Sequence, residues 1–359
     1  MDDPRKTHVI RGRGAASNEV GRFERHQRCV EDDGWVGDDD PLPPLRTETR
    51  VERPRRMISY NRSPDLSFDR SINPYRGCEH GCVYCFARPS HAYLGLSPGL
   101  DFETRLVARP DAPDVLQKEL AARSYKVAPI AIGTNTDPYQ PIEKKHQIMR
   151  ACLQVLAEAR HPVAIVTRGS LIERDLDILG EMAQQNLVRV GISVTTLDPA
   201  LARRMEPRAP APARRLRMIA RLAEAGVPVR VMASPMVPAL TDPALESILQ
   251  AARDAGARYA HWSMLRLPHE VAGLVETWLR DHVPDRADRV LARLREMHGG
   301  KLYDARWHHR MRGEGHYADM VAQRFKSAVR RLGLETVAPP LRCDLFAPPV
   351  LRGQQMSLF

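Results

Sequence analysis

Three cysteines in one short segment give the clearest chemical signal in the sequence. Cys78, Cys82 and Cys85 have the spacing C-x3-C-x2-C, just after a stretch predicted to be a strand. Three close thiolates on one loop can ligate three irons of a cubane iron–sulfur cluster, which normally takes four cysteines. The iron left open can chelate S-adenosylmethionine, and one electron then cleaves that molecule to methionine and a 5′-deoxyadenosyl radical. The spacing therefore predicts a [4Fe-4S] cluster and S-adenosylmethionine as cofactors.

A zinc site is the alternative, with His80 or His91 as the fourth ligand, because zinc prefers four tetrahedral nitrogen and sulfur ligands. Zinc sites usually use pairs of close cysteines, and the sequence has no second pair, so the cluster is favoured. The other three cysteines are scattered, and six cysteines in 359 residues are too sparse for a disulfide framework.

Downstream of the cysteines, short β-branched runs alternate with longer amphipathic stretches, which is the pattern of successive βα units. In the stretch 147–158, for example, apolar residues recur three and four positions apart. The expected strands are 130–133, 163–166, 188–194, 229–232 and 260–265, with a first strand near 72–75. This pattern predicts an α/β fold, a partial TIM-like (β/α)6 barrel of parallel strands, with a doubly wound open sheet as the alternative. In either architecture, functional side chains lie at the carboxyl ends of the strands.

The two ends of the chain differ from this middle part. Residues 1–57 hold 12 Lys/Arg and 12 Asp/Glu without apolar periodicity, and we expect a disordered arm there. The barrel domain is predicted over 58–285. A basic helical extension follows over 286–331, with 12 Lys/Arg against 5 Asp/Glu. Residues 332–359 are rich in proline and predict an extended tail.

The overall composition limits the class of protein. With 43% hydrophobic and 27% charged residues, it is typical of a soluble globular chain. The longest apolar stretches fall short of the roughly 18 residues that a membrane span requires. The N-terminus lacks the apolar run of a secretory signal, so we expect a cytoplasmic protein without membrane contact.

The cysteine loop has an aromatic residue before its last cysteine and Asn73-Pro-Tyr-Arg-Gly77 in front of it. In these features, and in its strand-end sequences, the chain resembles the radical S-adenosylmethionine (radical SAM) superfamily. Within that superfamily it is similar to the branch of spore photoproduct lyase, the DNA repair photolyase-like proteins. The resemblance covers roughly residues 58–285. It implies an enzyme that cleaves S-adenosylmethionine with an electron from a donor such as flavodoxin or ferredoxin.

The resemblance also implies cofactor contacts at the strand ends. The positions concerned are Tyr84, Thr134, Asn135, Thr136, Arg168 and Ser193. Tyr84 would pack near the adenine, and the run 134–136 would meet the methionyl amine, although a polar strand end is also an ordinary helix cap. Arg168 would hold the methionyl carboxylate or merely solvate a loop. Ser193 matches a polar residue that binds the ribose or the carboxylate.

Spore photoproduct lyases use a further cysteine to return a hydrogen atom to the product radical. Here Cys152 lies on the apolar face of a predicted helix and is interpreted as a buried structural thiol. Cys343, in the tail, is the candidate for this hydrogen donor, provided that the tail folds back over the barrel mouth. We therefore expect a different nucleic-acid lesion or a modified base as the substrate. The alternatives are a tRNA, a peptide or a metabolite, or a non-enzymatic clamp-associated protein with a structural metal loop.

Two features near the C-terminus suggest partners. In the stretch 307–317 basic residues alternate with aromatic ones, as on a nucleic-acid surface, and DNA is the favoured ligand. The last five residues resemble the peptide by which bacterial polymerases and repair proteins dock on the replication sliding clamp. Leu358 and Phe359 would be the apolar anchors, and Gln355 would form a hydrogen bond at the rim of the pocket.

Overall fold

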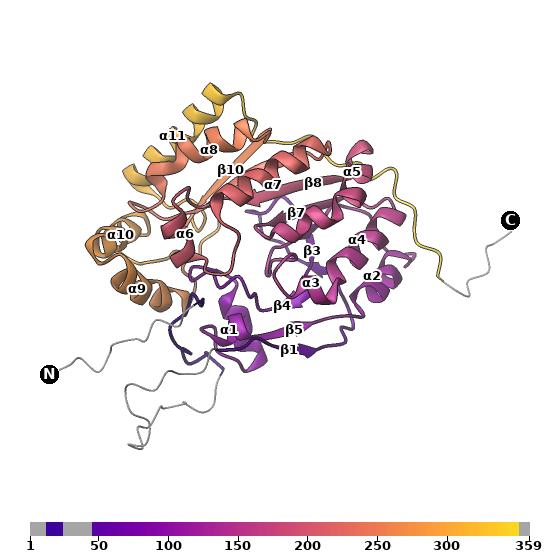
Figure 1. Cartoon of the computed structure of the whole chain (residues 1–359), viewed down its shortest axis with the longest axis horizontal. Coiled ribbons are helices and arrows are strands. Elements are labelled where there is room, and N and C mark those ends of the chain that lie inside the picture. The colour runs from indigo at the N-terminus through magenta and orange to yellow at the C-terminus, as the bar shows by residue number, and fades with distance from the viewer. Residues whose placement is uncertain (1–11, 24–44, 352–359) are drawn as a thin grey trace, which may run out of the picture.

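The centre of the computed structural model, which describes residues 12–23 and 45–351, is a seven-stranded sheet (Figure 1). Its strand order is β10-β9-β8-β7-β6-β3-β2, and every neighbouring pair is parallel except β2 with β3. The strands are β2 (Ser59–Tyr60), β3 (Arg70–Ile72), β6 (Ile130–Ile132), β7 (Val163–Thr167), β8 (Val188–Ser193), β9 (Val229–Met236) and β10 (Tyr259–Met264). The predicted α/β fold with six parallel strands is confirmed, with β10 and β2 as the two edges of an open sheet.

Helices cover one face of this sheet (Figure 1). In α4, Ile148, Cys152 and Leu156 recur at helical spacing and are all buried in the main core, as expected for a structural thiol at Cys152. The helices are α1 (Asp101–Thr104), α2 (Ala112–Leu120), α3 (Glu143–His146), α4 (Ile148–Glu158), α5 (Leu176–Gln184), α6 (Pro199–Met205), α7 (Pro212–Glu224), α8 (Leu245–Asp254), α9 (Val271–His282), α10 (Pro284–Met297) and α11 (Gly315–Leu332). Short 3-10 helices are η1 (Arg88–Leu94), η2 (Ser170–Asp175) and η3 (Asp242–Ala244).

A second, three-stranded sheet lies beside the start of the main one. It has the order β1-β5-β4, with β1 (Glu48–Val51) parallel to β5 (Arg105–Ala108) and β4 (Tyr75–Arg76) antiparallel to it. Because β4 follows directly on β3, this small sheet holds the start of the cysteine loop.

The last helix belongs to the main core. In α11, Phe325 packs on Trp262 of β10, with ring centroids 6.0 Å apart, and Val321 and Val329 are buried in the same cluster as the sheet. The predicted domain boundary at residue 285 therefore falls between helices that share one hydrophobic core. None of the described helices is long and apolar enough to span a bilayer.

Residues 306–313 connect the two edges of the sheet. The Met264 amide of β10 donates to the Met311 carbonyl at 2.8 Å. Asp65, between β2 and β3, accepts from Nε of Arg310 at 2.5 Å and from the His308 amide at 2.7 Å. Arg306 pairs with Asp304 at 2.5 Å. Within the stretch 307–317, Arg310 is therefore not a free cation, because its side chain is only 17% exposed and its charge is matched by Asp65.

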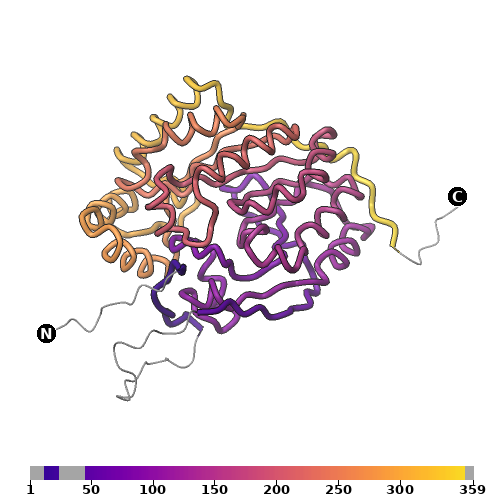
Figure 2. Tube along the Cα trace, viewed as in Figure 1, coloured from indigo at the N-terminus to yellow at the C-terminus, as the bar shows by residue number. Residues whose placement is uncertain are grey.

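Residues 335–347 run past the amino ends of the strands (Figure 2). The Glu335 carbonyl accepts from the Ala260 amide at 2.8 Å, and the Ala347 amide donates to the Ala159 carbonyl, before β7, at 2.9 Å. Cys343, on this part of the tail, lies near Arg70, the first residue of β3. The expectation that Cys343 folds over the barrel mouth is thus wrong, because backbone hydrogen bonds hold the tail at the opposite end of the sheet.

Candidate functional site

The cysteine loop lies at the carboxyl edge of the sheet, where the chain leaves β3 and β4. The Cys78 and Cys82 side chains are buried, and Cys85 is half-buried. Burial raises the pKa of Cys78, and the nearby Asp137, Cys82 and Cys85 add to the effect. Burial also raises the pKa of Cys82 to about 12, although the Arg168 cation opposes it. The three thiols therefore lie close enough to affect one another's charge.

Three separate segments fix the backbone of this loop. The Gln140 amide group accepts from the Glu79 N–H at 2.9 Å and donates to the Gly77 carbonyl at 3.1 Å. The Cys78 N–H donates to the Phe102 carbonyl at 2.9 Å, and the Val83 N–H to the Met205 carbonyl at 3.1 Å. With its backbone groups satisfied in this way, the loop presents its thiols from a fixed position.

A buried ion pair lies under the loop. Arg88 donates to Oε1 of Glu103 at 2.5 Å and, through Nε, to the Cys82 carbonyl at 2.9 Å. Both side chains are fully buried. Glu103 also accepts from the backbone N–H groups of Gly14 and Ala15 at 3.0 and 2.9 Å. A single carboxylate thus links the loop to a segment near the N-terminus.

That N-terminal segment packs directly on the cysteine loop. A Cβ at Gly14 would lie 1.7 Å from the Gly81 carbonyl oxygen, so only glycine fits there. Arg13 donates to the carbonyls of Glu103 at 3.1 Å and Leu45 at 2.7 Å. The expectation of a disordered arm over 1–57 is therefore wrong for residues 12–23 and for β1, because these contacts with distant residues order the segment.

A second buried carboxylate, Glu206, lies behind the loop, between α6 and α7. It accepts from Arg168 at 2.7 Å and from Thr195 at 3.0 Å, and it also meets Arg215 and the Tyr84 hydroxyl. Burial alone would raise the pKa of Glu206, but the two arginines outweigh it and hold the pKa at about 2. Glu206 is therefore a carboxylate at neutral pH, and Arg168 is held 3.1 Å from Sγ of Cys82.

Asp137, after β6, is another buried carboxylate, and it contacts the cysteine loop at His80. Its carboxylate lies 3.4 Å from Nδ1 of His80 and accepts from the Thr167 hydroxyl at 2.6 Å. Burial opposes ionisation, yet these partners hold the pKa of Asp137 at about 2. His91 is also engaged, since its Nε2 lies 2.9 Å from the Arg105 carbonyl. Nδ1 of each of these two histidines, by contrast, is buried without a hydrogen-bond partner among the described residues.

The side chains expected to bind S-adenosylmethionine lie at the carboxyl ends of four adjacent strands: β3, β6, β7 and β8. After β6, Asn135 and Thr136 donate backbone N–H groups to the Asn73 side chain at 3.2 and 3.4 Å. Thr134 precedes them, and Ser193 ends β8 in a buried position. Tyr84 and Arg168 meet each other at 2.5 Å. In this structure Arg168 already has protein partners, so a cofactor carboxylate would have to share or replace one of them.

Several residues that hold this site were not identified from the sequence. They are Arg88, Glu103, Asp137, Gln140, Glu206 and Arg215. Most of them contact the loop, or one another, across large separations in the sequence, so no local spacing identifies them. Of these residues, only Asp137 could have been identified as a site residue, because it stands in the polar stretch directly after a predicted strand.

The donor set suits a cluster better than a single ion. Among the residues that the structure describes, no three His, Cys, Asp or Glu side chains converge as one metal ion requires. A cubane cluster spaces its thiolates more widely than one ion does, and three thiolates leave one of its irons open. The neighbouring Arg168 cation favours the thiolate form of Cys82, which is the form that binds metal.

Comparisons with known proteins agree with this chemistry. The sequence profile of the Radical SAM superfamily matches residues 72–252, which include the cysteine loop and the strands β6 to β9. An uncharacterized protein of Mycobacterium tuberculosis is 38% identical over 235 residues, covering 65% of this chain and 68% of its own length. An uncharacterized protein of Methanocaldococcus jannaschii is 26% identical over 172 residues, covering 48% of this chain and 61% of its own length.

Solved structures show the same fold. Spore photoproduct lyase in complex with a dinucleoside spore photoproduct has a TM-score of 0.57 at 14% identity, covering 80% of this chain and 81% of its own. A form of that enzyme with AdoMet and the dinucleoside both bound also has a TM-score of 0.57. At this identity the likeness concerns the fold alone.

Proposed function

Because the chain belongs to the radical SAM superfamily, whose members use a [4Fe-4S] cluster and S-adenosylmethionine, we propose that Cys78, Cys82 and Cys85 hold that cluster and that the substrate is a nucleic acid. The bound cluster supplies the electron that cleaves S-adenosylmethionine to methionine and a 5′-deoxyadenosyl radical. The fixed three-thiol loop at the carboxyl edge of the sheet is the observation that carries this proposal. Anaerobic reconstitution with iron and sulfide, followed by assay of 5′-deoxyadenosine under dithionite, tests it.

The chain's own residues have three tasks in this scheme. Arg168 and the buried ion pair of Arg88 with Glu103 hold Cys82 from both sides. The polar groups after β6 and β8 would orient the methionyl and ribose parts of S-adenosylmethionine. The segment 12–18 covers part of the loop, so it would limit the access of water and oxidants to the cluster.

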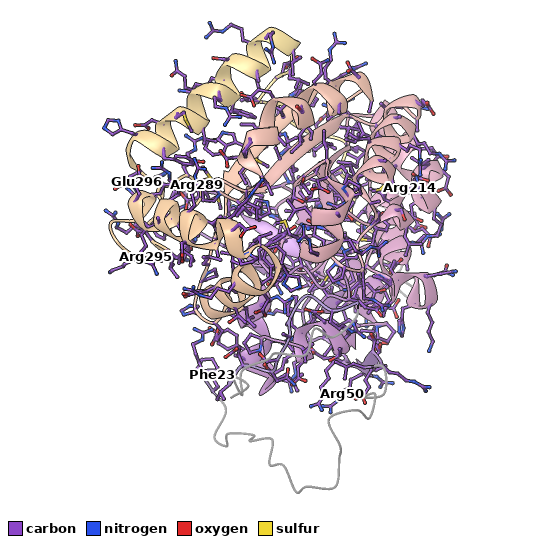
Figure 3. All side chains as sticks on the ribbon, turned by 60° about the vertical axis from the view of Figure 1, so that its left-hand side comes forward. Phe23, Arg50, Arg214, Arg289, Arg295 and Glu296 are labelled. Carbon is purple, nitrogen blue, oxygen red and sulfur yellow. The ribbon has the colours of Figure 1, made fainter. Side chains whose placement is uncertain are left out.

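Exposed aromatic side chains beside the loop support the nucleic-acid class. Phe86 follows Cys85 directly, is 44% exposed, and has the Arg266 guanidinium 4.5 Å from its ring centroid. Tyr93 is 71% exposed and lies 5.1 Å from the ring of Phe23, which Figure 3 places at the margin of the molecule. Exposed aromatic rings with nearby arginines are typical of surfaces on which single-stranded bases stack.

The combined change Phe86→Ala and Tyr93→Ala is therefore expected to weaken the binding of single-stranded DNA or RNA. Base stacking contributes roughly 1–3 kcal/mol per ring, so at least about tenfold weaker binding is expected. Fluorescence anisotropy with labelled oligonucleotides measures it. Tyr60→Ala is the matched control, because Tyr60 is 64% exposed but lies on β2, opposite the amino end of β3. Equal affinities for the wild type and the double variant would point instead to a peptide or metabolite substrate.

The proposed docking on a sliding clamp involves Gln355, Leu358 and Phe359, which lie outside the described residues. A peptide of residues 355–359 is expected to bind purified bacterial clamp, and Leu358→Ala with Phe359→Ala is expected to abolish binding, because the two apolar anchors supply most of the affinity of so short a peptide. Calorimetry measures both peptides. Equal signals from the two would contradict the clamp proposal and leave the cofactor chemistry untouched.

A further inference from the structure

Three basic side chains lie on the face of the main sheet that the helices leave uncovered, called the inner face below. They are Arg189 of β8, Arg230 of β9 and His261 of β10. Their chain neighbours Val188, Val190, Val229, Val231, Ala260 and Trp262 are buried in the core between sheet and helices. Because side chains alternate along a strand, the three basic groups point to the opposite side.

The strand register brings these groups together. Arg230 is paired with Gly191, two residues beyond Arg189, and His261 is paired with Met232, two residues beyond Arg230. Each basic residue is thus a diagonal neighbour of the next, within reach of a long side chain. The residues in line with Arg189 on the preceding strands are Ala164, Ala131 and Ser71, whose side chains are all small.

These cations have no matching carboxylate in the described part of the chain. No hydrogen bond or ion pair of the Arg189 side chain occurs there. Arg230 donates to the Thr336 carbonyl at 3.2 Å and lies over the Tyr259 ring at 6.0 Å, but its buried Nε has no partner. By contrast, Arg88 and Arg215 each meet a buried carboxylate.

The pKa shifts of these three basic groups also indicate that they lack a counter-charge. Burial lowers the pKa of Arg189, and burial together with the charge of Arg189 lowers the pKa of Arg230. Burial, Arg230 and Arg312 hold the pKa of His261 at about 4. Partly buried like charges without a counter-charge destabilise a fold, so an anion placed among them would be stabilised.

We propose that Arg189, Arg230 and His261 form an oxyanion site on the inner face that takes a phosphate group of the substrate. The two guanidinium groups match the oxygens of a phosphate bidentately, and the neutral His261 ring adds a third donor through its N–H group. The choice of phosphate rests on the nucleic-acid class proposed above, whereas the anion site itself rests only on the arrangement of these side chains.

Titration of the full-length protein with inorganic phosphate, at ionic strength held constant with sodium chloride, tests the site. The wild type is expected to unfold at a higher temperature as phosphate increases, because a ligand that binds only the folded state stabilises it. The double variant Arg189→Gln with Arg230→Gln is expected to bind phosphate at least about tenfold more weakly in calorimetry. Without phosphate, it is expected to unfold at the same temperature as the wild type or higher, since it lacks the uncompensated charges.

The matched control is Arg289→Gln with Arg295→Gln, which removes the same charge from the outer surface of α10 (Figure 3). This control is expected to keep the phosphate response. If the Gln variant does not fold, the variant Arg189→Lys with Arg230→Lys retains the charges without the planar fork and is expected to bind phosphate more weakly than the wild type. Phosphate responses that are absent from the wild type, or equal in all variants, would overturn the proposal.

Parallel titrations with acetate distinguish the source of the anion. A response to acetate that depends on the two arginines, without one to phosphate, would assign the site to a carboxylate and overturn the phosphate assignment. None of these measurements needs the cluster or S-adenosylmethionine. Their failure would therefore leave the proposed cofactor cleavage standing, and a failure of cofactor cleavage would leave the anion site standing.

Discussion

Replacing any one of Cys78, Cys82 and Cys85 by alanine is expected to abolish the reductive cleavage of S-adenosylmethionine and to lower the iron content of the reconstituted protein. Each thiol supplies one of three cluster ligands, and the loop offers no fourth cysteine to take its place. Iron analysis, the charge-transfer absorption of the cluster and release of 5′-deoxyadenosine measure the effect.

Cys343→Ala is the control for these variants. Its thiol lies at the amino end of the sheet and donates a long hydrogen bond to the Leu341 carbonyl at 3.9 Å. The variant is therefore expected to keep its iron and its cleavage activity. A triple alanine variant of the loop that retained normal iron content would contradict the assignment of the cluster ligands.

The sheet and the cysteine loop were predictable because both leave local signals in the sequence. The β-branched runs at 163–166 and 188–194 match β7 and β8 closely, since a strand buried by a helix layer needs such residues. The three cysteines lie within eight residues of one another, so their chemistry could be inferred without knowing the fold. The polar residues after β6 were likewise predicted to belong to the site, because the carboxyl ends of parallel strands lie together at one edge of the sheet.

The supports of the loop were not predictable, because their contacts join residues far apart in the chain. Glu206 meets the Tyr84 hydroxyl across 122 positions, and Glu103 meets the Gly14 amide across 89. The composition around Arg13 and Gly14 is typical of disorder, and only the buried carboxylate and the close approach to Gly81 explain why the segment is ordered. The count of charged residues over 286–331 likewise could not reveal that Arg310 pairs with Asp65, which lies far away in the sequence.

Removal of the Glu206 carboxylate is expected to destabilise the fold strongly. Its carboxylate is fully buried and meets both Arg168 and Arg215, the latter only 1% exposed. Glu206→Ala leaves these two cations without a counter-charge, which costs about 3–5 kcal/mol of unfolding free energy for a buried pair that loses one member. Urea unfolding, with and without reconstituted cluster, measures the loss.

Glu173→Ala is the matched control, because Glu173 also accepts from two arginines. Arg214 and Arg221 are 32% and 58% exposed, so water solvates them when the carboxylate is lost, and a cost of about 0–1 kcal/mol is expected. The two variants also differ in their effect on the site. Only Glu206→Ala frees Arg168, whose Nη1 lies 3.1 Å from Sγ of Cys82, so only this variant is expected to lose iron on reconstitution. Equal losses of stability and iron in both variants would mean that burial of the carboxylate does not matter, and that Arg168 is positioned by Tyr84 and the loop alone.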